Sequence, residues 1–209
     1  SEPSELITKL NIPQGKKVIG LYTNVMWDAQ LHYPANVFNN MLEWIIKTVE
    51  YFISRPDLIL VIRVHPAELT GHLKSRQLVT EKIQEHFLHI PENIKIVGPD
   101  NKLNSYTLAK MCDSVIIYGT KTGVELSSMG IPVIVAGEAW LRGKKISTDV
   151  SNQIGYFEVL DQLPLNERLD EKKILRARKY AYHFFFRRMI PLRSIIDTGG
   201  IPQYKLNIS

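Results

Sequence analysis

The sequence has one cysteine and no hydrophobic run long enough to cross a membrane. Its only thiol among 209 residues is Cys112, so no disulfide can form within the chain. A membrane-spanning helix needs roughly 20 consecutive apolar residues, and the polar start SEPSELITKL is unlike a signal peptide. Cys112 lies where a predicted helix meets a buried strand, which is typical of a core residue. These absences predict a cytoplasmic protein.

Two familiar phosphate-binding motifs and an obvious metal site are also absent. GxGxxG does not occur, and neither Gly119–Gly123 nor Gly143-Lys144 completes a Walker A loop. His86 and His89 share a helix face without a third ligand nearby, so we expect no metal. The net charge of +5 favours an anionic ligand or surface without requiring nucleic acid.

Short apolar runs alternate with segments of helical periodicity along most of the chain. Helices are predicted at about 35–54 and 75–89, before Cys112, and from 122 to Gly130. Strands are predicted at 17–23, 58–64, 94–97, 114–118 and 133–135. This order predicts an α/β fold, a Rossmann-like doubly wound parallel sheet with a C-terminal helical tail. Within it, 1–16 is a linker or chain boundary, 17–165 the nucleotide-sugar-binding domain, and 166–209 a basic aromatic helix and tail packing on that domain.

The stretch 112–137 forms the centre of this pattern as a strand, a polar turn, a short helix and a second strand. Backbone N–H groups, two hydroxyls and one ammonium converge where the strand meets the helix, which suits a phosphate. The turn residues are Gly119, Thr120, Lys121, Thr122 and Gly123. The alternative is a plain connection in which Thr122 is the N-cap and Glu125 its capping-box partner.

Two more loops at predicted strand ends carry candidate ligand-binding side chains. His65 can donate to a phosphate oxygen while Pro66 fixes the backbone, although such a histidine can also be a packing residue. Ser105 is either an N-cap or a hydroxyl donor to a nucleotide, and Glu125 can accept from both ribose hydroxyls. Further candidates for the same cleft are Asn24, Glu68, Arg142 and Lys144.

A basic and aromatic segment follows the domain. Seven basic residues lie between Lys172 and Arg188, interleaved with tyrosines and phenylalanines, after an expected N-cap at Asp170. Such a helix can pack its rings on the domain, lie on an anionic membrane surface, or stack on nucleic acid. We rank these roles in that order and expect no nucleic-acid partner.

Several of these segments, taken in order, resemble the carboxyl-terminal part of bacterial capsule polysaccharide synthesis proteins, which include transferases of 3-deoxy-manno-octulosonate (Kdo). They are RVHPAE, NSYTLAKMCDSVIIYGTKTGVELSSMGIPVIVAG, AWLRGKKISTD and ARKYAYHFFFRRMIPL. Members of that family resemble GT-B glycosyltransferases, whose second Rossmann-like domain binds the nucleotide of the sugar donor. The resemblance implies donor-binding roles for His65, Pro66, Ser105, Thr120, Thr122 and Glu125. In GT-B proteins the final helices commonly cross to the partner domain, so rings exposed on the tail would be an interface for that domain.

By this resemblance the whole protein transfers a sugar, Kdo-like and from a CMP donor or else UDP-linked, to a glycan acceptor in surface polysaccharide synthesis. No metal or other cofactor is implied. The sequence holds one of the two GT-B domains, so its partners are the sugar nucleotide, an N-terminal acceptor domain, the glycan, and the inner face of a membrane. Two alternatives stay open, a non-catalytic nucleotide-binding or scaffold domain and half of a nucleotide-sugar 2-epimerase.

Overall fold

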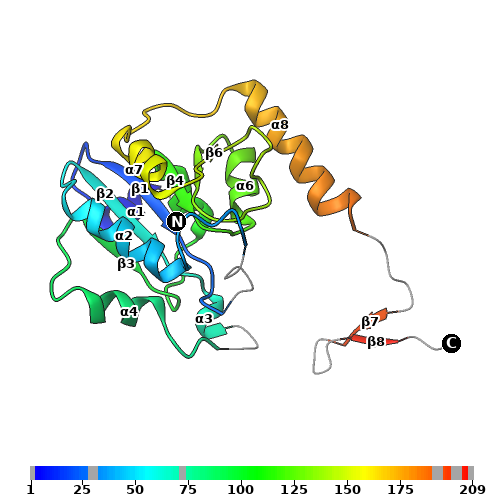
Figure 1. Ribbon diagram of the computed structural model, residues 1–209, viewed down its shortest axis with the longest axis horizontal. Helices are drawn as coiled ribbons and strands as arrows, with labels where there is room; N and C mark the ends of the chain where they lie inside the picture. The colour runs from blue at the N-terminus through cyan, green and yellow to red at the C-terminus, as the bar shows by residue number, and fades with distance from the viewer. Residues whose placement is uncertain (1–2, 28–32, 71–73, 190–194, 199–203, 207–209) are drawn as a thin grey trace.

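Six parallel strands form one sheet in the order β3-β2-β1-β4-β5-β6. The computed structural model describes residues 3–27, 33–70, 74–189, 195–198 and 204–206 (Figure 1). The strands are β1 (Lys17–Tyr22), β2 (Leu58–Arg63), β3 (Ile94–Val97), β4 (Ser114–Ile117), β5 (Val133–Val135) and β6 (Thr148–Asp149). Every residue of β2 and β4 is buried, as expected of apolar strands covered on both faces. The predicted doubly wound α/β fold is confirmed.

Helices cover both faces of the sheet and divide the core into two clusters. One cluster includes residues of α2 (Met41–Ile53), α4 (Val79–His86) and α7 (Gln153–Asp161). The other includes residues of α1 (Pro3–Lys9), α5 (Ser105–Met111), α6 (Thr122–Ser128) and α8 (Glu171–Tyr182). The remaining elements are α3 (Ala67–Thr70), the π-helix η2 (His183–Arg187), and the antiparallel pair β7 (Ile195–Asp197) and β8 (Tyr204–Leu206).

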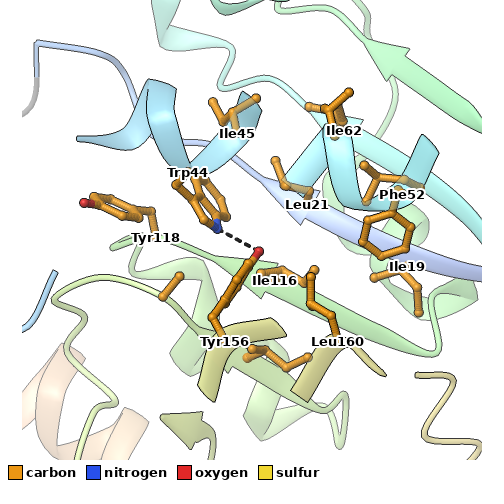
Figure 2. Packing of buried hydrophobic residues seen from close by; sticks show 14 of the residues in the cluster. Ile19, Leu21, Trp44, Ile45, Phe52, Ile62, Ile116, Tyr118, Tyr156 and Leu160 are labelled. Carbon is orange, nitrogen blue, oxygen red and sulfur yellow. Dashed lines mark hydrogen bonds between the residues drawn. The ribbon is translucent and has the colours of Figure 1, made fainter. Parts of the chain in front are cut away.

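A buried polar network joins α2 to α7 (Figure 2). The Trp44 indole N–H donates to the Tyr156 hydroxyl at 3.0 Å. Thr48 donates its proton to the Trp44 carbonyl, so the Tyr156 hydroxyl donates to Thr48 Oγ1 at 2.6 Å. All three side chains are fully buried, and each polar atom has a partner. The network fixes α7, a helix that the sequence pattern did not predict.

Helix α2 begins later than predicted. The Asn40 side chain accepts from the Glu43 backbone N–H at 2.8 Å, and the Glu43 carboxylate accepts from the Asn39 backbone N–H at 2.8 Å. These bonds satisfy N–H groups that a helix end leaves unpaired, so they place the start at Met41. The prediction of a helix from Ala35 was wrong by about two turns because apolar spacing does not locate a cap.

The first residues are also part of the packed structure, contrary to the expectation of a linker. Residues 3–9 form α1, where Leu6 is 1% exposed, and Ile12 just beyond it is buried. Both side chains pack in the same cluster as Leu108 of α5. Apolar burial therefore attaches this segment to the domain.

The tail helix α8 packs on the domain through α6 (Figure 1). Asp170 is its N-cap, as predicted, and its side chain accepts from the Lys173 backbone N–H at 2.7 Å. Ala177 is fully buried, and Arg178 Nε donates to the Ser128 carbonyl at 3.1 Å. In the described part of the chain, no helix is both long and apolar enough to span a bilayer.

Candidate functional site

A cavity of about 820 Å³ opens at the carboxyl edge of the parallel strands. Its walls come from the segments that follow β1, β2, β4 and β5, together with the first turns of α5 and α6. The lining residues are Asn24, Tyr33, Pro34, His65, Tyr106, Gly119, Thr120, Lys121, Thr122, Glu125, Glu138, Ala139 and Trp140. This edge is where ligands bind in open α/β sheets.

The structure brings seven of the predicted site residues together in this cavity. They come from three separate loops, and the sheet order explains their convergence, because β2, β1 and β4 are neighbours. The seven are Asn24, His65, Gly119, Thr120, Lys121, Thr122 and Glu125.

The turn after β4 is shaped by hydroxyl groups. Thr120 Oγ1 accepts from the Thr122 backbone N–H at 3.3 Å and lies 3.2 Å from Thr122 Oγ1, to which it donates. Lys121 occupies the N-cap position of α6 without a side-chain capping bond, and its side chain is exposed. The capping-box alternative, with Thr122 as the cap, is therefore wrong.

His65 presents a defined tautomer at the end of β2. Its Nδ1 accepts from the Ala67 backbone N–H at 3.1 Å, so a neutral ring carries its proton on Nε2. The backbone N–H of His65 donates to Thr23 Oγ1 at 3.1 Å, which joins this loop to the end of β1. Nearby, buried Asn24 accepts from the Gly119 backbone N–H at 3.3 Å. These contacts hold the three loops in register.

Glu125 and Tyr106 form a hydrogen-bonded pair in the cavity wall. The Tyr106 hydroxyl donates to the Glu125 carboxylate at 2.7 Å, and this bond together with burial raises the pKa of Tyr106 to about 12. The carboxylate lies one turn into α6 and is half-buried. One carboxylate oxygen is thus oriented by the tyrosine, while a carboxylate offers about four acceptor positions.

Ser105 and Gly123 have structural surroundings instead of lining the cavity. Ser105 Oγ accepts from Arg63 Nε at 3.1 Å, and the N-cap of α5 is Asn104, so the N-cap alternative for Ser105 was wrong. A Cβ on Gly123 would meet Ile117 Cδ1 at 2.5 Å, so glycine lets α6 approach the sheet.

Glu68, a predicted cleft residue, is fully buried and does not line the cavity. One carboxylate oxygen accepts from the Val79 backbone N–H at 3.2 Å, and the other has no hydrogen-bond partner among the described residues. Burial raises the pKa of Glu68 to about 7. The carboxyl group connects α3 to the start of α4, which explains why it does not face the cavity.

Three other predicted residues also lie outside the lining. The Arg142 guanidinium donates to the carbonyls of Gly137, Val135 and Val150 at distances from 2.9 to 3.1 Å. The Lys144 ammonium lies 5.7 Å from the centre of the Tyr180 ring. The Pro66 carbonyl accepts from Thr70 Oγ1 at 3.0 Å, and this proline directly precedes the short helix α3.

Comparisons with known proteins identify the family. The sequence pattern described as capsule polysaccharide biosynthesis protein matches residues 4–164. The chain belongs to this family. No curated protein matches the sequence significantly.

Solved structures share the fold of this capsule-family chain at low identity. UDP-GlcNAc 2-epimerase from Neisseria meningitidis, bound to UDP-GlcNAc, is 16% identical with a TM-score of 0.56, covering 88% of this chain and 50% of that chain. S. aureus MnaA, in a structure with UDP, is 15% identical with a TM-score of 0.53, and the match covers 88% of this chain and 48% of that chain. KpsC of Thermosulfurimonas dismutans, a beta Kdo 2,7 transferase, is 19% identical with a TM-score of 0.49, and the match covers 84% of this chain and 50% of that chain. The chain therefore spans about half the length of these structures.

The capsule-family chain also has lining residues that the sequence reasoning missed. Tyr106 follows the predicted Ser105 directly, and its pairing with Glu125 depends on a contact between α5 and α6 that spacing alone does not show. Glu138 and Trp140 follow β5, where the Asn36 side chain accepts from the Glu138 backbone N–H at 2.9 Å. The sequence did carry a signal for Glu138 and Trp140, because a segment that follows a central parallel strand lies at the carboxyl edge of the sheet, where the other candidate residues are. The described residues hold no group of three potential metal-ligating His, Cys, Asp or Glu side chains.

Proposed function

We propose that this capsule-family chain is the donor-binding half of a glycosyltransferase, and that its cavity holds the nucleotide part of a sugar donor. The observation that supports this most strongly is the convergence of His65, Thr122 and Glu125 in one cavity of about 820 Å³. They supply a hydrogen-bond donor for phosphate, a hydroxyl and an acceptor for ribose hydroxyls from two segments, the loop after β2 and the first turn of α6. The volume lies in the range of small-molecule sites, about 300 to 1,000 Å³.

The phosphate of the donor would lie between His65 and the turn after β4. Nε2 of His65 carries the proton in the neutral ring, and Lys121 adds a positive charge to the same wall. Thr122 Oγ1 accepts from Thr120, so its own proton is directed elsewhere and is available to an oxygen acceptor.

The ribose would lie against Glu125. A carboxylate can accept from two vicinal hydroxyls, and the Tyr106 hydroxyl fixes its orientation at 2.7 Å. Charge-assisted hydrogen bonds of this kind are shorter and stronger than neutral ones. A ribonucleotide is therefore the expected ligand, with CMP or UDP as the nucleotide and no metal or other cofactor.

Sugar transfer would break the bond between the anomeric carbon and the donor phosphate as an acceptor hydroxyl attacks that carbon. The electron pair stays on the phosphate, and the hydroxyl proton goes to a base that the N-terminal acceptor domain supplies. His65, Lys121 and Thr122 would stabilise the leaving phosphate. The glycan acceptor would lie in the cleft between the two domains of a cytoplasmic protein.

The test is the affinity of His65→Ala for nucleotides and nucleosides. A charge-assisted bond contributes roughly 1.5 to 3 kcal/mol, so CMP and UMP should each bind about ten- to a hundred-fold more weakly. Cytidine and uridine, which lack the phosphate, should be almost unaffected. Calorimetric titration of all four ligands measures the difference, and a thermal-shift panel of CMP, UDP, GDP and ADP selects the base.

The control variant is His89→Ala, which removes an exposed histidine outside the cavity lining. It should leave every affinity unchanged. An unchanged CMP affinity in folded His65→Ala would remove His65 from the site. An equal loss for nucleoside and nucleotide would make it a packing residue.

A further inference from the structure

The outward face of α8 and η2 presents large apolar side chains to solvent. Leu175, Tyr182, Phe186 and Met189 are 54, 60, 68 and 71% exposed. Leu175, Tyr182 and Phe186 differ in position by seven and four residues, which places them along one side of the helix. Met189 follows two residues after the end of η2. The Tyr182 and Phe186 rings stack with centroids 5.7 Å apart. Together these four residues form an exposed apolar ridge.

The opposite face of the same segment is anchored to the domain. Ala177 is fully buried, and the Tyr180 hydroxyl donates to the Trp140 carbonyl at 2.5 Å. Phe184 packs on Trp140 with ring centroids 5.0 Å apart. A π-turn holds an extra residue and so changes the helical register. Here it accompanies a change from Phe184 on the domain to Phe186 in solvent, so the ridge is exposed while the helix stays fixed.

Basic side chains flank the ridge. A hollow of about 460 Å³ is lined, among the described residues, by Arg178, Lys179, Tyr182, His183 and Arg187. No carboxylate belongs to this described lining, and the sequence has none between Lys172 and Arg188. Lys179 and Arg187 form no ion pair within the described part of the chain. The surface thus combines unneutralised positive charge with exposed rings and a thioether.

We propose that this face docks on the surface of an anionic phospholipid bilayer. Phe186 and Met189 have no hydrogen-bonding group that needs water, so they suit the boundary between headgroups and acyl chains, where Tyr182 can keep its hydroxyl in water. Lys179 and Arg187 lie where lipid phosphates would neutralise them. The inference goes beyond donor binding and does not depend on it.

Charge and apolarity together favour lipid over the other partners. Nucleic acid would use the cations and stack on the rings, but it would leave Met189 and Leu175 in water. A second protein would need a matching acidic and apolar surface. A bilayer with anionic headgroups supplies both properties in one plane, along the whole length of the ridge.

Vesicle flotation tests the proposal on the full 209-residue chain. Vesicles of phosphatidylcholine with phosphatidylglycerol should bind the protein, and vesicles of phosphatidylcholine alone should bind at least about tenfold more weakly. Raising the salt concentration should weaken binding to the anionic vesicles. Free inorganic phosphate should not compete, which separates a lipid surface from a phosphate-ion site.

Two double variants remove the positive charge and the apolar surface of this face separately. Lys179→Glu with Arg187→Glu should reduce binding to anionic vesicles by at least about tenfold, and Phe186→Ser with Met189→Ser should do the same by removing apolar contact. The charge-matched control is Lys9→Glu with Lys102→Glu. The apolar control is Leu88→Ser with Ile154→Ser, at exposed positions outside the tail. Both controls should bind like the unaltered chain.

Three outcomes would overturn the proposal. They are equal binding to neutral and anionic vesicles, no binding to either, or equal loss in the controls and the tail variants. Retained CMP binding in every variant would show that the cavity is intact. Binding to an oligonucleotide or self-association that the same tail variants abolish, without vesicle binding, would assign the face to nucleic acid or to a second copy.

Discussion

Two sets of polar side chains lie at the carboxyl edge of the sheet, and their surroundings differ. Outside the cavity lining, Arg63 is 5% exposed and Glu68 is fully buried, and both bond to backbone groups. In the cavity wall, His65, Thr122 and Glu125 lie at the surface of an open space. All five residues follow or end a strand, or begin the next helix. Position at the edge therefore brings a residue near the site, and the local backbone decides whether it faces the ligand.

The largest expected effect comes from the buried set, in Arg63→Met. The guanidinium donates to the carbonyls of Gly98, Asn101 and Leu103, and methionine would leave these acceptors without that donor. We expect unfolding free energy to fall by about 3 kcal/mol or more, which lowers Tm by roughly 6 to 12 °C. Thermal and urea denaturation measure this.

The matched control for this change is Arg76→Met, at an exposed arginine that should alter Tm little. CMP affinity of the folded Arg63 variant should be reduced far less than its stability. A stable Arg63→Met variant that no longer binds CMP would instead show that Arg63 contributes to ligand binding.

Glu68→Gln tests the buried set through pH. Burial raises the folded pKa to about 7 from an ordinary value of 4.5, so the carboxyl group favours folding fully below pH 4.5 and loses that contribution as pH rises through 7. The unaltered chain should lose roughly 3 kcal/mol relative to Glu68→Gln across this window. Urea midpoints at several pH values give the slope, with exposed Glu92→Gln as the control. Parallel slopes for all three proteins would mean that Glu68 titrates normally.

Glu125→Gln tests the wall set. Removing the negative charge should weaken CMP binding by about tenfold, from the loss of roughly 1.5 kcal/mol in a charge-assisted bond. The 2′-deoxy analogue should lose less, because it lacks one of the two hydroxyls. Glu138→Gln, another carboxyl in the lining, is the control and should affect both ligands equally or not at all. Equal losses for CMP and its deoxy analogue in Glu125→Gln would return this residue to a structural role.

The smallest effect is expected for Tyr106→Phe, which keeps the ring and removes the hydroxyl that orients Glu125. CMP affinity should fall about threefold to fivefold, equivalent to roughly 1 kcal/mol. Combined with Glu125→Gln it should add almost nothing, since the two side chains act as a pair. Tyr33→Phe, in the same lining, is the control. Full additivity of the two changes would show that Tyr106 acts on the ligand independently of Glu125.

Much of the sheet was predictable because its strands are apolar, short and bounded by turn residues. The ranges 94–97 and 133–135 match β3 and β5. Helix α7 was missed because its burial depends on two residues, Tyr156 and Leu160, and on hydrogen bonds to a distant helix. The same holds for α1, which is fixed by tertiary contacts of Leu6 and not by its own pattern.

At the site, the sequence predicted which loops converge better than which side chains line the space. Parallel strands place their following loops at one edge, so His65, Thr122 and Glu125 meet as expected. The prediction for Arg142 was wrong because its guanidinium donates to three nearby backbone carbonyls instead of facing the cavity. A sequence motif does not show which backbone carbonyls need a side-chain donor. Tyr106 was overlooked because its partner is on another helix.

Strand β1 lies inside the sheet, yet it precedes every other strand of that sheet in the sequence. Ile19 pairs with Leu60 on one side and Ser114 on the other, so neither edge of β1 has a partner until those later segments have been synthesised. Pairings between residues so far apart in sequence form slowly, and an apolar strand with both edges open is prone to aggregate. Any nascent chain that stops short of β4 keeps one edge of β1 bare, which makes β1 the segment most in need of chaperone cover during translation.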